Sequence, residues 1–409
     1  MSLKRTRTAA LCLAVTVVTF CASVLFLRKN PTPPSSDDIG YYTLASNVAS
    51  GHGFSEDGVA PAIFRPPLFS TLLGSWFYLT GRSSLYSACL FQGLMHSLAC
   101  GAAFLLFLEV FGLPCLALGL SLWLGLMPPH LSRITLILQE PTIMFFTTVS
   151  ALLSLRLMRE PSAGASIRTG AAWGLCTLSK SVSWFGPLLV VLFQYATGLF
   201  LVSKKTALIL LLSFAAVLSP WVIRNYARFN RLIIVNAQGA GMLEYNMSRT
   251  YKQSLFNKDL DVAEGDRLIK EMNADKLSDS QKNDRLRNFM RKTAGYYIFG
   301  RVVSAAVYFT FPDFFQNWYK TPTAPPLRFQ KIIAYGWWIL LTIPLYLALL
   351  YRSAQFVKRG LNAPLSFLLV FYLLYWAQYA LIWGDPRFSV PVYPILLCLL
   401  PIPDRWSKR

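Results

Sequence analysis

The chain has 409 residues, of which 54% are hydrophobic and 14% are charged, and its mean hydropathy is +0.44. Because an ordinary soluble domain is nearer a quarter charged, this composition excludes a soluble globular protein and indicates an integral membrane protein. The net charge of +20 does not indicate a nucleic-acid-binding protein, since so apolar a chain leaves no basic face free in water. The excess of cations instead predicts a topology signal together with an anionic ligand.

The N-terminus begins with a basic stretch, followed by an apolar run from about Thr8 to Leu27. The run is long enough to span a bilayer, so we expect a retained signal-anchor helix. A cleaved signal peptide is the alternative, because Cys21, Ala22 and Ser23 are small enough to form a cleavage site.

Apolar runs with basic flanks predict about ten membrane-spanning helices. The predicted spans are 8–27, 85–110, 114–130, 139–157, 168–181, 183–202, 206–223, 331–351, 364–383 and 387–402. With this count the Lys and Arg clusters of the short loops fall on one side, which the positive-inside rule identifies as cytoplasmic. Both termini are then cytoplasmic, and residues 1–409 form a single transmembrane domain. The composition and the lack of a eukaryotic targeting signal fit a bacterial inner membrane.

The opposite, periplasmic face receives two larger loops, residues 28–84 and residues 225–330. In the first loop, the stretch from Leu68 to Thr80 is apolar but too short to cross, so we expect an interfacial or re-entrant helix. The second loop turns from charged to amphipathic, which is typical of helices that lie along the membrane surface. The sequence contains neither a P-loop pattern nor GxGxxG, so it does not predict a nucleotide-phosphate site.

The stretch SSDDIGYYTLASNVASGHGF opens the first loop with two adjacent carboxylates, Asp37 and Asp38. Acidic and polar residues before a periodic apolar run indicate a helix start, and capping is one role open to them. The same loop continues to Gly51-His52-Gly53-Phe54 and then to Phe64-Arg65-Pro66-Pro67-Leu68. It therefore joins a carboxylate pair and a cation in one non-cytoplasmic segment.

With these motifs the chain resembles the GT-C glycosyltransferases, in the branch that contains the lipid A aminoarabinose transferases and the protein O-mannosyltransferases. The resemblance covers most of the chain except the polar loop around 250–290. The aminoarabinose transferases carry an acid just before the cation of the first loop, where Phe64 stands here, and this departure argues against metal binding of that kind. The further motifs, in order, are Gln139-Glu140-Pro141, Leu178-Ser179-Lys180-Ser181, Ser219-Pro220-Trp221-Val222-Ile223-Arg224-Asn225-Tyr226, Gly239-Ala240-Gly241, and Asp385-Pro386-Arg387-Phe388 with Pro391.

The resemblance implies an all-α polytopic membrane protein with the GT-C fold and amphipathic juxtamembrane helices in the first periplasmic loop. It implies an inverting transferase that moves a hexose or pentose from a polyprenyl-phosphate carrier to a hydroxyl of a glycolipid, polysaccharide or protein. Asp37 matches the family's catalytic position and is the expected general base, while Asp38 orients the loop. Glu140 is a second site carboxylate that could contact the sugar or a divalent metal ion; its alternative role is to stabilise a helix start.

Cations are expected near the departing lipid phosphate, whose negative charge they stabilise. Arginine can engage two phosphate oxygens, whereas lysine supplies a point charge. Interfacial snorkelling is the alternative for each such cation at the end of a span. The expected phosphate ligands are Arg65, Lys180, Arg224 and Arg387, and the candidate substrate contacts are Tyr41, Tyr42 and His130.

Two other functions remain open on the sequence. A ligase or polymerase that moves a whole lipid-linked oligosaccharide would use the same face and similar cations. An anion or lipid transporter would also have many spans, but transporters place polar groups near the bilayer midplane, between two related halves. Here the ionisable residues gather at one face, and no pairing of halves is visible in the sequence.

Overall fold

The computed structural model describes residues 2–30, 36–196, 204–236, 322–359, 362–382 and 386–403, together with positions 281, 284, 285 and 288. Within these residues the regular elements are helices, and the one extended pairing is an isolated bridge between Ser55 and Pro61. This confirms the predicted all-α fold class. Apart from the four isolated positions, the surface helices predicted between 237 and 321 lie outside the described residues.

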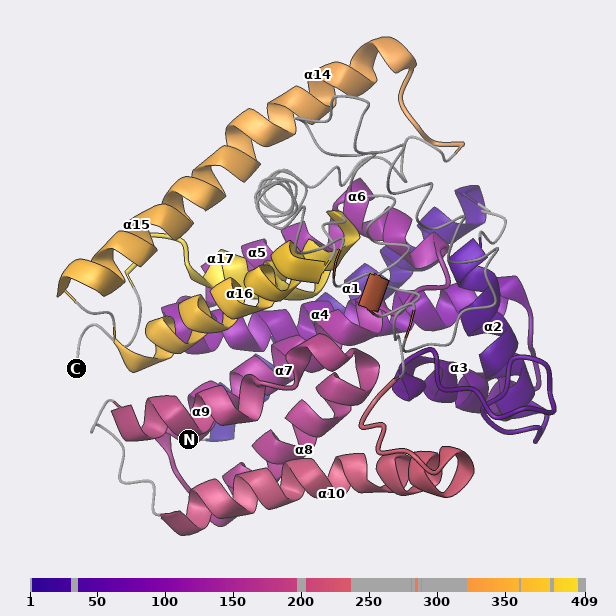
Figure 1. Cartoon of the computed structure of the whole chain (residues 1–409). Helices are drawn as coiled ribbons and strands as arrows, with labels where there is room; N and C mark the ends of the chain where they lie inside the picture. The colour runs from indigo at the N-terminus through magenta and orange to yellow at the C-terminus, as the bar shows by residue number, and fades with distance from the viewer. Residues whose placement is uncertain are drawn as a thin grey trace. The chain divides into compact units, whose positions relative to one another are not determined.

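The chain divides into two units, residues 1–236 with 314–372 and 390–409, and residues 237–313 with 373–389. Figure 1 shows the helices in chain order. In the first half they are α1 (Ser2–Lys29), α2 (Ser36–Ala49), α3 (Pro67–Thr80), α4 (Leu85–Phe111), α5 (Pro114–Leu126), α6 (Pro128–Leu131), η1 (Ser132–Thr135), α7 (Glu140–Arg159), α8 (Ala163–Ser179), η2 (Ser181–Ser183), α9 (Gly186–Ala196) and α10 (Lys204–Phe229). The later helices are α14 (Leu327–Trp337), the π-helical segment η4 (Trp338–Thr342), α15 (Ile343–Arg359), α16 (Ala363–Ile382), η5 (Pro386–Val392) and α17 (Tyr393–Cys398).

The number of spans differs from the expectation. Among the described residues, five helices are long and apolar enough to cross a membrane, and the pair α5–α6, bent by 53°, is a sixth candidate. Each predicted span corresponds to a helical segment, but several of these segments are short, so the expected count of about ten spans is not confirmed. The five long helices are Arg5–Lys29, Leu85–Phe111, Glu140–Arg159, Lys204–Phe229 and Leu327–Lys358.

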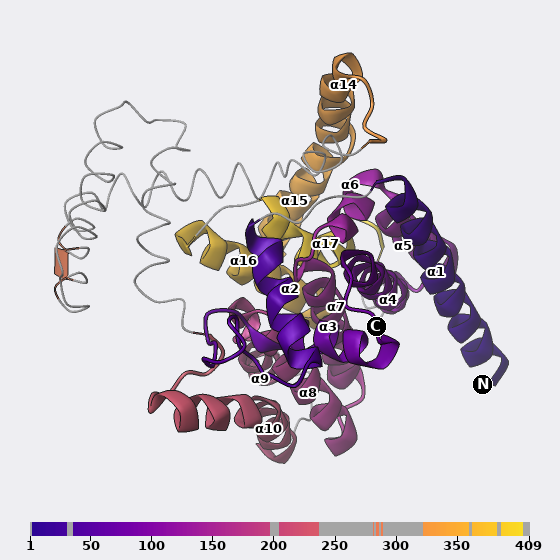
Figure 2. The same cartoon turned by 90° about the vertical axis from the view of Figure 1, so that its right-hand side faces the viewer.

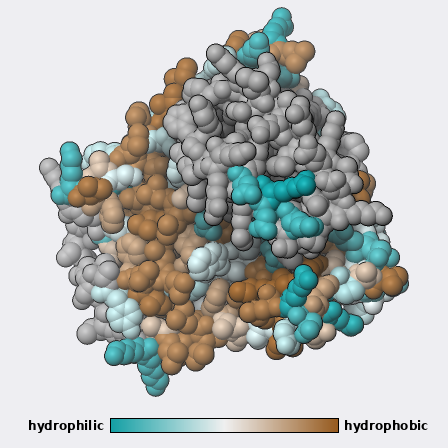
Figure 3. All heavy atoms as spheres, viewed as in Figure 1, coloured by the Kyte–Doolittle hydropathy of each residue, from teal (hydrophilic) through white to brown (hydrophobic). Residues whose placement is uncertain are grey.

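On the face that Figure 3 shows, apolar residues (brown) cover much of the described surface. Leu13 of α1, Leu192 of α9 and Leu347 of α15 are each more than half exposed. So much exposed apolar surface is typical of a face in contact with another apolar phase, which here is the lipid bilayer. On the inner side, α1 lies against α4 and α5 (Figure 2), so the first helix is packed into the bundle.

The first loop is itself a packed unit on α4. The predicted membrane-dipping segment is α3, which starts after Pro66 and ends at Gly81, whose φ of 63° is the left-handed conformation that favours glycine. A side chain at Gly74 would lie 2.7 Å from the carbonyl oxygen of Ala45, so glycine allows α3 to approach α2 closely. The indole of Trp76 donates to the hydroxyl of Ser87 at 2.9 Å, which ties α3 to α4.

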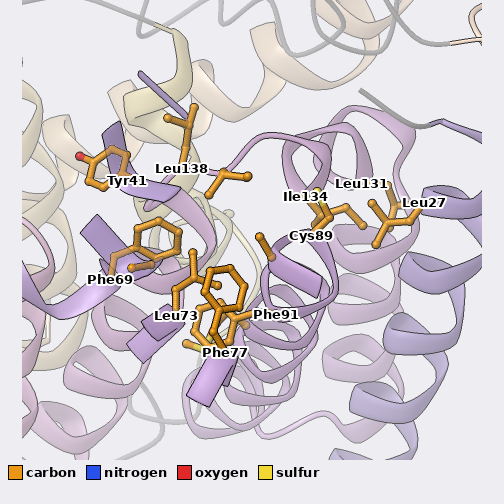
Figure 4. Packing of buried hydrophobic residues seen from close by; sticks show 14 residues of the cluster. Leu27, Tyr41, Phe69, Leu73, Phe77, Cys89, Phe91, Leu131, Ile134 and Leu138 are labelled. Atoms are coloured by element: carbon orange, nitrogen blue, oxygen red, sulfur yellow. The ribbon is translucent and has the colours of Figure 1, made fainter. Parts of the chain in front are cut away.

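Aromatic side chains fill the space between α2, α3 and α4. The ring of Tyr41 packs edge-on against Phe69 at 5.4 Å, and Phe69 lies 6.2 Å from Phe91. Figure 4 shows these side chains converging with Leu73 and Phe77 in one cluster. Because each aromatic side chain buries on the order of 150–250 Å², this cluster fixes α2, and with it the two acids at its start, on the bundle.

Candidate functional site

A closed loop follows α2, and we call its residues 54–62 the strap. The chain enters it through Gly51 and Gly53, which have φ values of 82° and 74°. The amide of Ala62 donates to the carbonyl of Phe54 at 2.9 Å and closes the strap. The carboxylate of Asp57 accepts hydrogen bonds from the amides of Val59 and Ala60 and from the hydroxyl of Ser55. These hydrogen bonds favour the ionised carboxylate and lower the pKa of Asp57 below its ordinary value.

The strap leads into Arg65, which the structure brings together with the predicted base. Its Nη2 is 3.7 Å from Oδ1 of Asp37, and its Nε is 3.8 Å from Oε1 of Glu56 in the strap. The guanidinium carbon also lies 4.4 Å from the centroid of the Tyr41 ring. Asp37, Gly40 and Tyr41 share one helix face, since residues three and four apart are neighbours on a helix. Three of the predicted site residues, Asp37, Arg65 and Tyr41, are thus in one cluster.

The absence of a side chain at Gly40 leaves room for the guanidinium of Arg65. A β-carbon there would lie 2.7 Å from Nε of Arg65 and closer still to Nη2, so a larger residue would displace the guanidinium. The Arg65 side chain is 14% exposed, whereas those of Asp37 and Glu56 are 47% and 51% exposed. The site therefore combines a shielded cation with two carboxylates that remain open to an incoming molecule.

The neighbours of these residues on α2 have different surroundings. Asp38 is buried, with 1% of its surface exposed. The hydroxyl of Tyr42 donates to the carbonyl of Ser83 at 2.6 Å, and its ring packs edge-on against Phe77. Tyr42, which was a candidate substrate contact, thus links α2 to the turn before α4.

Glu140 and His130 lie on the second outer connection, between α5 and α7. Glu140 is the first residue of α7, as its position before Pro141 predicts, and it is 3% exposed. The amide of Gln92 donates to the carbonyls of Leu136 and Leu138 and so fixes the residues that lead into α7. His130 is equally buried, and its ring lies 5.4 Å from that of Tyr393. Both side chains are enclosed by protein.

Two of the predicted phosphate ligands stand at helix junctions. Lys180 ends α8, with its amide donating to the carbonyl of Cys176 at 3.0 Å, and its residue is partly buried. Arg387 is in the first turn of η5, in the second unit, where its guanidinium carbon lies 5.1 Å from the ring centroid of Phe388. Phe388 in turn stacks on Tyr379 at 4.5 Å, so this arginine is part of an aromatic ladder.

Arg224, the fourth predicted phosphate ligand, contacts the strap. Near the end of α10, its Nη1 donates to the carbonyl of Ala62 at 2.8 Å and its Nη2 donates to the carbonyl of Phe54 at 3.2 Å. The ring of Trp221 lies 4.6 Å from its guanidinium carbon. The two terminal nitrogens are therefore bonded to the two residues that close the strap.

The described side chains do not fit a divalent metal ion. No three His, Cys, Asp or Glu side chains come together in the part of the chain that the structure describes. The carboxylates of Asp37 and Glu56 each face the guanidinium of Arg65, at 3.7 and 3.8 Å. A divalent ion needs several oxygen ligands directed at one point. Here the two carboxylates instead face the guanidinium of Arg65.

Sequence reasoning missed Gly40 and Glu56. Gly40 could have been found, because it lies three residues after Asp37 and next to Tyr41, on the face where a cation must approach the base. Glu56 could not, since its position depends on how the strap turns back, and the hydrogen bonds that close the strap involve backbone groups.

No protein-family model matches the sequence, and a comparison with curated proteins found no match. Solved structures do match. The archaeal oligosaccharyltransferase AglB from Archaeoglobus fulgidus, in complex with an inhibitory peptide and a dolichol-phosphate, has a TM-score of 0.56 and 16% identity over 95% of this chain and 50% of that chain. A structure of the oligosaccharyltransferase of the same organism with Zn and sulfate has a TM-score of 0.54 and 16% identity over 94% of this chain and 48% of that chain.

ArnT from Cupriavidus metallidurans, bound to undecaprenyl phosphate, has a TM-score of 0.44 and 13% identity over 95% of this chain and 77% of that chain. The fold assignment rests on the two oligosaccharyltransferase structures. The chain has the GT-C fold of these polytopic membrane proteins, which confirms the predicted fold. It spans about half the length of the oligosaccharyltransferase chains that it matches.

Proposed function

We propose that the chain is an inverting membrane glycosyltransferase that moves a sugar from a polyprenyl-phosphate carrier to an acceptor hydroxyl at the periplasmic face. The observation that carries the proposal is the cluster of Asp37, Arg65 and Tyr41 on the first outer loop of a GT-C fold. A phosphate-linked lipid donor is supported by the dolichol-phosphate in the AglB complex. Membrane lipids and a glycolipid, glycan or protein acceptor are the proposed partners, and nucleic acid is not.

Asp37 is the proposed general base. It takes the proton of the acceptor hydroxyl while that oxygen attacks the anomeric carbon from the side opposite the phosphate, and the bond between the anomeric carbon and the phosphate oxygen breaks. The carrier leaves as polyprenyl phosphate, and the configuration at the anomeric carbon is inverted. The half-exposed carboxylate can be reached by an acceptor, and the shielded Arg65 holds it in place.

The other site residues keep the roles that their motifs imply. Lys180 and Arg387 are proposed to bind the donor phosphate, together with Arg65, because the leaving group gains negative charge in the transition state. Glu140 is proposed to contact the sugar, and Asp38 to orient the loop. This part of the proposal rests on the sequence motifs, as do the bacterial inner membrane and the cytoplasmic termini.

A second candidate is a transferase that moves a whole lipid-linked oligosaccharide. It is favoured by the fold likeness to oligosaccharyltransferases, with TM-scores of 0.56 and 0.54. Both candidates use a lipid-phosphate donor and a base on the first outer loop, so they differ in the mass that is transferred.

The test is mass spectrometry of the lipids, glycans and envelope proteins of cells that lack this protein. The cells are supplied again with the wild-type chain, with Asp37→Asn or with Glu160→Gln, a matched control at a 79% exposed acid beside Arg159. We expect the mass of one sugar to be restored by the wild type and by the control, and not by Asp37→Asn. Removing a general base typically costs 10²–10⁴-fold in rate, roughly enough to abolish the product.

The outcomes separate the candidates. An oligosaccharide mass restored by the wild type would support the second candidate. Equal restoration by Asp37→Asn would exclude Asp37 as the base. If no sugar-containing product differs between cells with and without the chain, the proposed function is wrong.

A further inference from the structure

Arg224, which lies far from the strap in the sequence, is hydrogen-bonded to both ends of the strap. Arg224 donates from Nη1 to the carbonyl of Ala62 and from Nη2 to the carbonyl of Phe54, and these two residues are the pair that closes the strap. The sequence separations are 162 and 170 residues, so the contact joins two distant parts of the chain. In Figure 1 the end of α10 and the segment after it reach the loop between α2 and α3.

The guanidinium of Arg224 makes further contacts at the same junction. Nη1 also donates to Oδ1 of Asn225 at 2.9 Å, so both of its hydrogens are in use. The rings of Trp221 and Phe229 lie 4.6 and 5.5 Å from the guanidinium carbon. The ring of Phe54 packs edge-on against Trp221 at 5.0 Å, which adds an apolar contact to the same junction. The terminal edge of the guanidinium, one of the two edges that can bind a phosphate at two points, is occupied by carbonyls.

The chain after α10 adds more bonds to the same junction. Asn230, with φ of 50°, ends the helix, and the chain folds back so that Asn225 donates to the carbonyl of Ile233 at 2.9 Å. Trp221 donates to the carbonyl of Val235 at 2.5 Å. Asn236 then donates to the carbonyl of Phe64 at 3.2 Å, one residue before Arg65. Residues 221–236 thus hold the first loop on both sides of the strap's exit.

We propose that Arg224 is a positioning residue that fixes the strap, and through it the catalytic cluster, rather than a ligand of the donor phosphate. The strap carries Glu56, whose carboxylate faces Nε of Arg65, while Nη2 of the same guanidinium faces Asp37. A change in the strap therefore moves Glu56, then Arg65, and then the counter-charge of the base. The part of this inference that concerns Asp37 as the general base rests on the proposed function.

The experiment compares Arg224→Ala with Lys180→Ala in the purified full-length chain in lipid nanodiscs. Hydrogen–deuterium exchange without any donor follows the amides of Val59, Ala60 and Ala62, which are bonded inside the strap. We expect Arg224→Ala to speed their exchange by about tenfold or more, because exchange reports local opening, and Lys180→Ala to leave it unchanged. In transfer assays Arg224→Ala should lower kcat with the donor KM unchanged, whereas Lys180→Ala should raise the donor KM.

A second variant keeps the test decisive if Arg224→Ala does not fold. Asn236→Ala removes the bond to Phe64 without changing any charge, so it should speed exchange around residues 62–66 and lower kcat by a smaller factor. Unchanged strap exchange in Arg224→Ala with a raised donor KM would make Arg224 a phosphate ligand and overturn the proposal. If Arg224→Ala does not fold, unchanged exchange and kcat in Asn236→Ala would overturn the proposal that residues 221–236 position the strap.

The exchange readout needs no sugar transfer, so it separates this inference from the proposed function. If the wild-type chain transfers no sugar but strap exchange depends on Arg224, the strap assignment stands and the proposed function fails. If the wild type transfers sugar and neither variant changes strap exchange, the proposed function stands and the strap assignment fails.

Discussion

Arginine is used differently at the two ends of α4. At the Phe111 end, the carboxylate of Glu109 is 6% exposed, contacts Arg159 directly and lies 3.7 Å from Arg156. At the Leu85 end, in the first loop, the arginine is the shielded partner, and its two carboxylates are about half exposed. A buried acid between two arginines is a closed structural cluster of three residues, whereas a shielded cation beside open acids leaves those acids available for chemistry.

Arg352 shows what a purely structural arginine looks like in this chain. It is 7% exposed and donates from Nη2 to the carbonyls of Leu400 and Ile402, at 2.9 and 3.3 Å, where it caps the end of α17. Arg224 makes the same kind of bond to carbonyls of the strap. Arg65 differs from Arg352 and Arg224, because it faces two carboxylates at distances longer than a hydrogen bond.

Among the variants that test the difference between the two ends of α4, Arg65→Ala should have the largest effect. It removes the cation that faces both Asp37 and Glu56, so the base loses its fixed position. We expect sugar transfer per folded molecule to fall on the order of 100-fold, since a misplacement of about 1 Å can cost that much. Thermal unfolding should change little, because the two half-exposed carboxylates can be solvated by water. Initial rates at saturating donor and acceptor, together with unfolding temperatures, measure both quantities.

Glu109→Gln is the matched change at the other end of α4. It leaves Arg156 and Arg159 without their buried counter-charge, so stability should fall by roughly 2 kcal/mol, less than for a fully buried pair because both arginines are partly exposed. The transfer rate per folded molecule should stay unchanged. Equal losses of rate in Glu109→Gln and Arg65→Ala would remove the distinction between the two ends.

The sequence predicted elements whose ends are marked by local chemistry. The first-loop helix expected over 68–80 is Pro67–Thr80, because prolines precede it and Gly81 ends it. The span expected over 85–110 is Leu85–Phe111, with Ser84 as its N-cap. The number of spans was not predictable in the same way, since Pro128 and Pro129 break the run at the bend between α5 and α6.

Long-range contacts were beyond the sequence. It placed Asp37 and Arg65 on the same loop, but their approach depends on Gly40 and on the way the strap closes. It grouped Arg224 with phosphate ligands because an arginine at the outer end of a span fits that role. The bonds of Arg224 to Phe54 and Ala62 join residues more than 160 positions apart, and no local pattern encodes them.

Gly40→Ala tests the position of Arg65 with a smaller change than the removal of its side chain. The added methyl group takes the place where the guanidinium of Arg65 lies, so we expect a rate loss of about tenfold, or about 1.4 kcal/mol in the barrier. Alanine favours a helix by about 1 kcal/mol over glycine, so the loss cannot come from a weaker α2. In an Arg65→Ala background the same change should cost nothing further, and an undiminished loss there would show that Gly40 acts by another route.

The smallest expected effect is the pH dependence of hydrogen exchange in the strap. The amides of Val59 and Ala60 and the hydroxyl of Ser55 bond the ionised Asp57 and lower its pKa. A carboxyl whose folded pKa lies below its unfolded value adds stability that is complete above the unfolded pKa, about 3.9, and is lost as the pH falls through the folded value. Strap exchange, corrected for the intrinsic rate, should therefore rise slightly below about pH 4 in the wild type and stay flat in Asp57→Asn. The rise should be small because Arg224 holds the strap carbonyls independently of pH, and an equal rise in Asp57→Asn would show that Asp57 is not its cause.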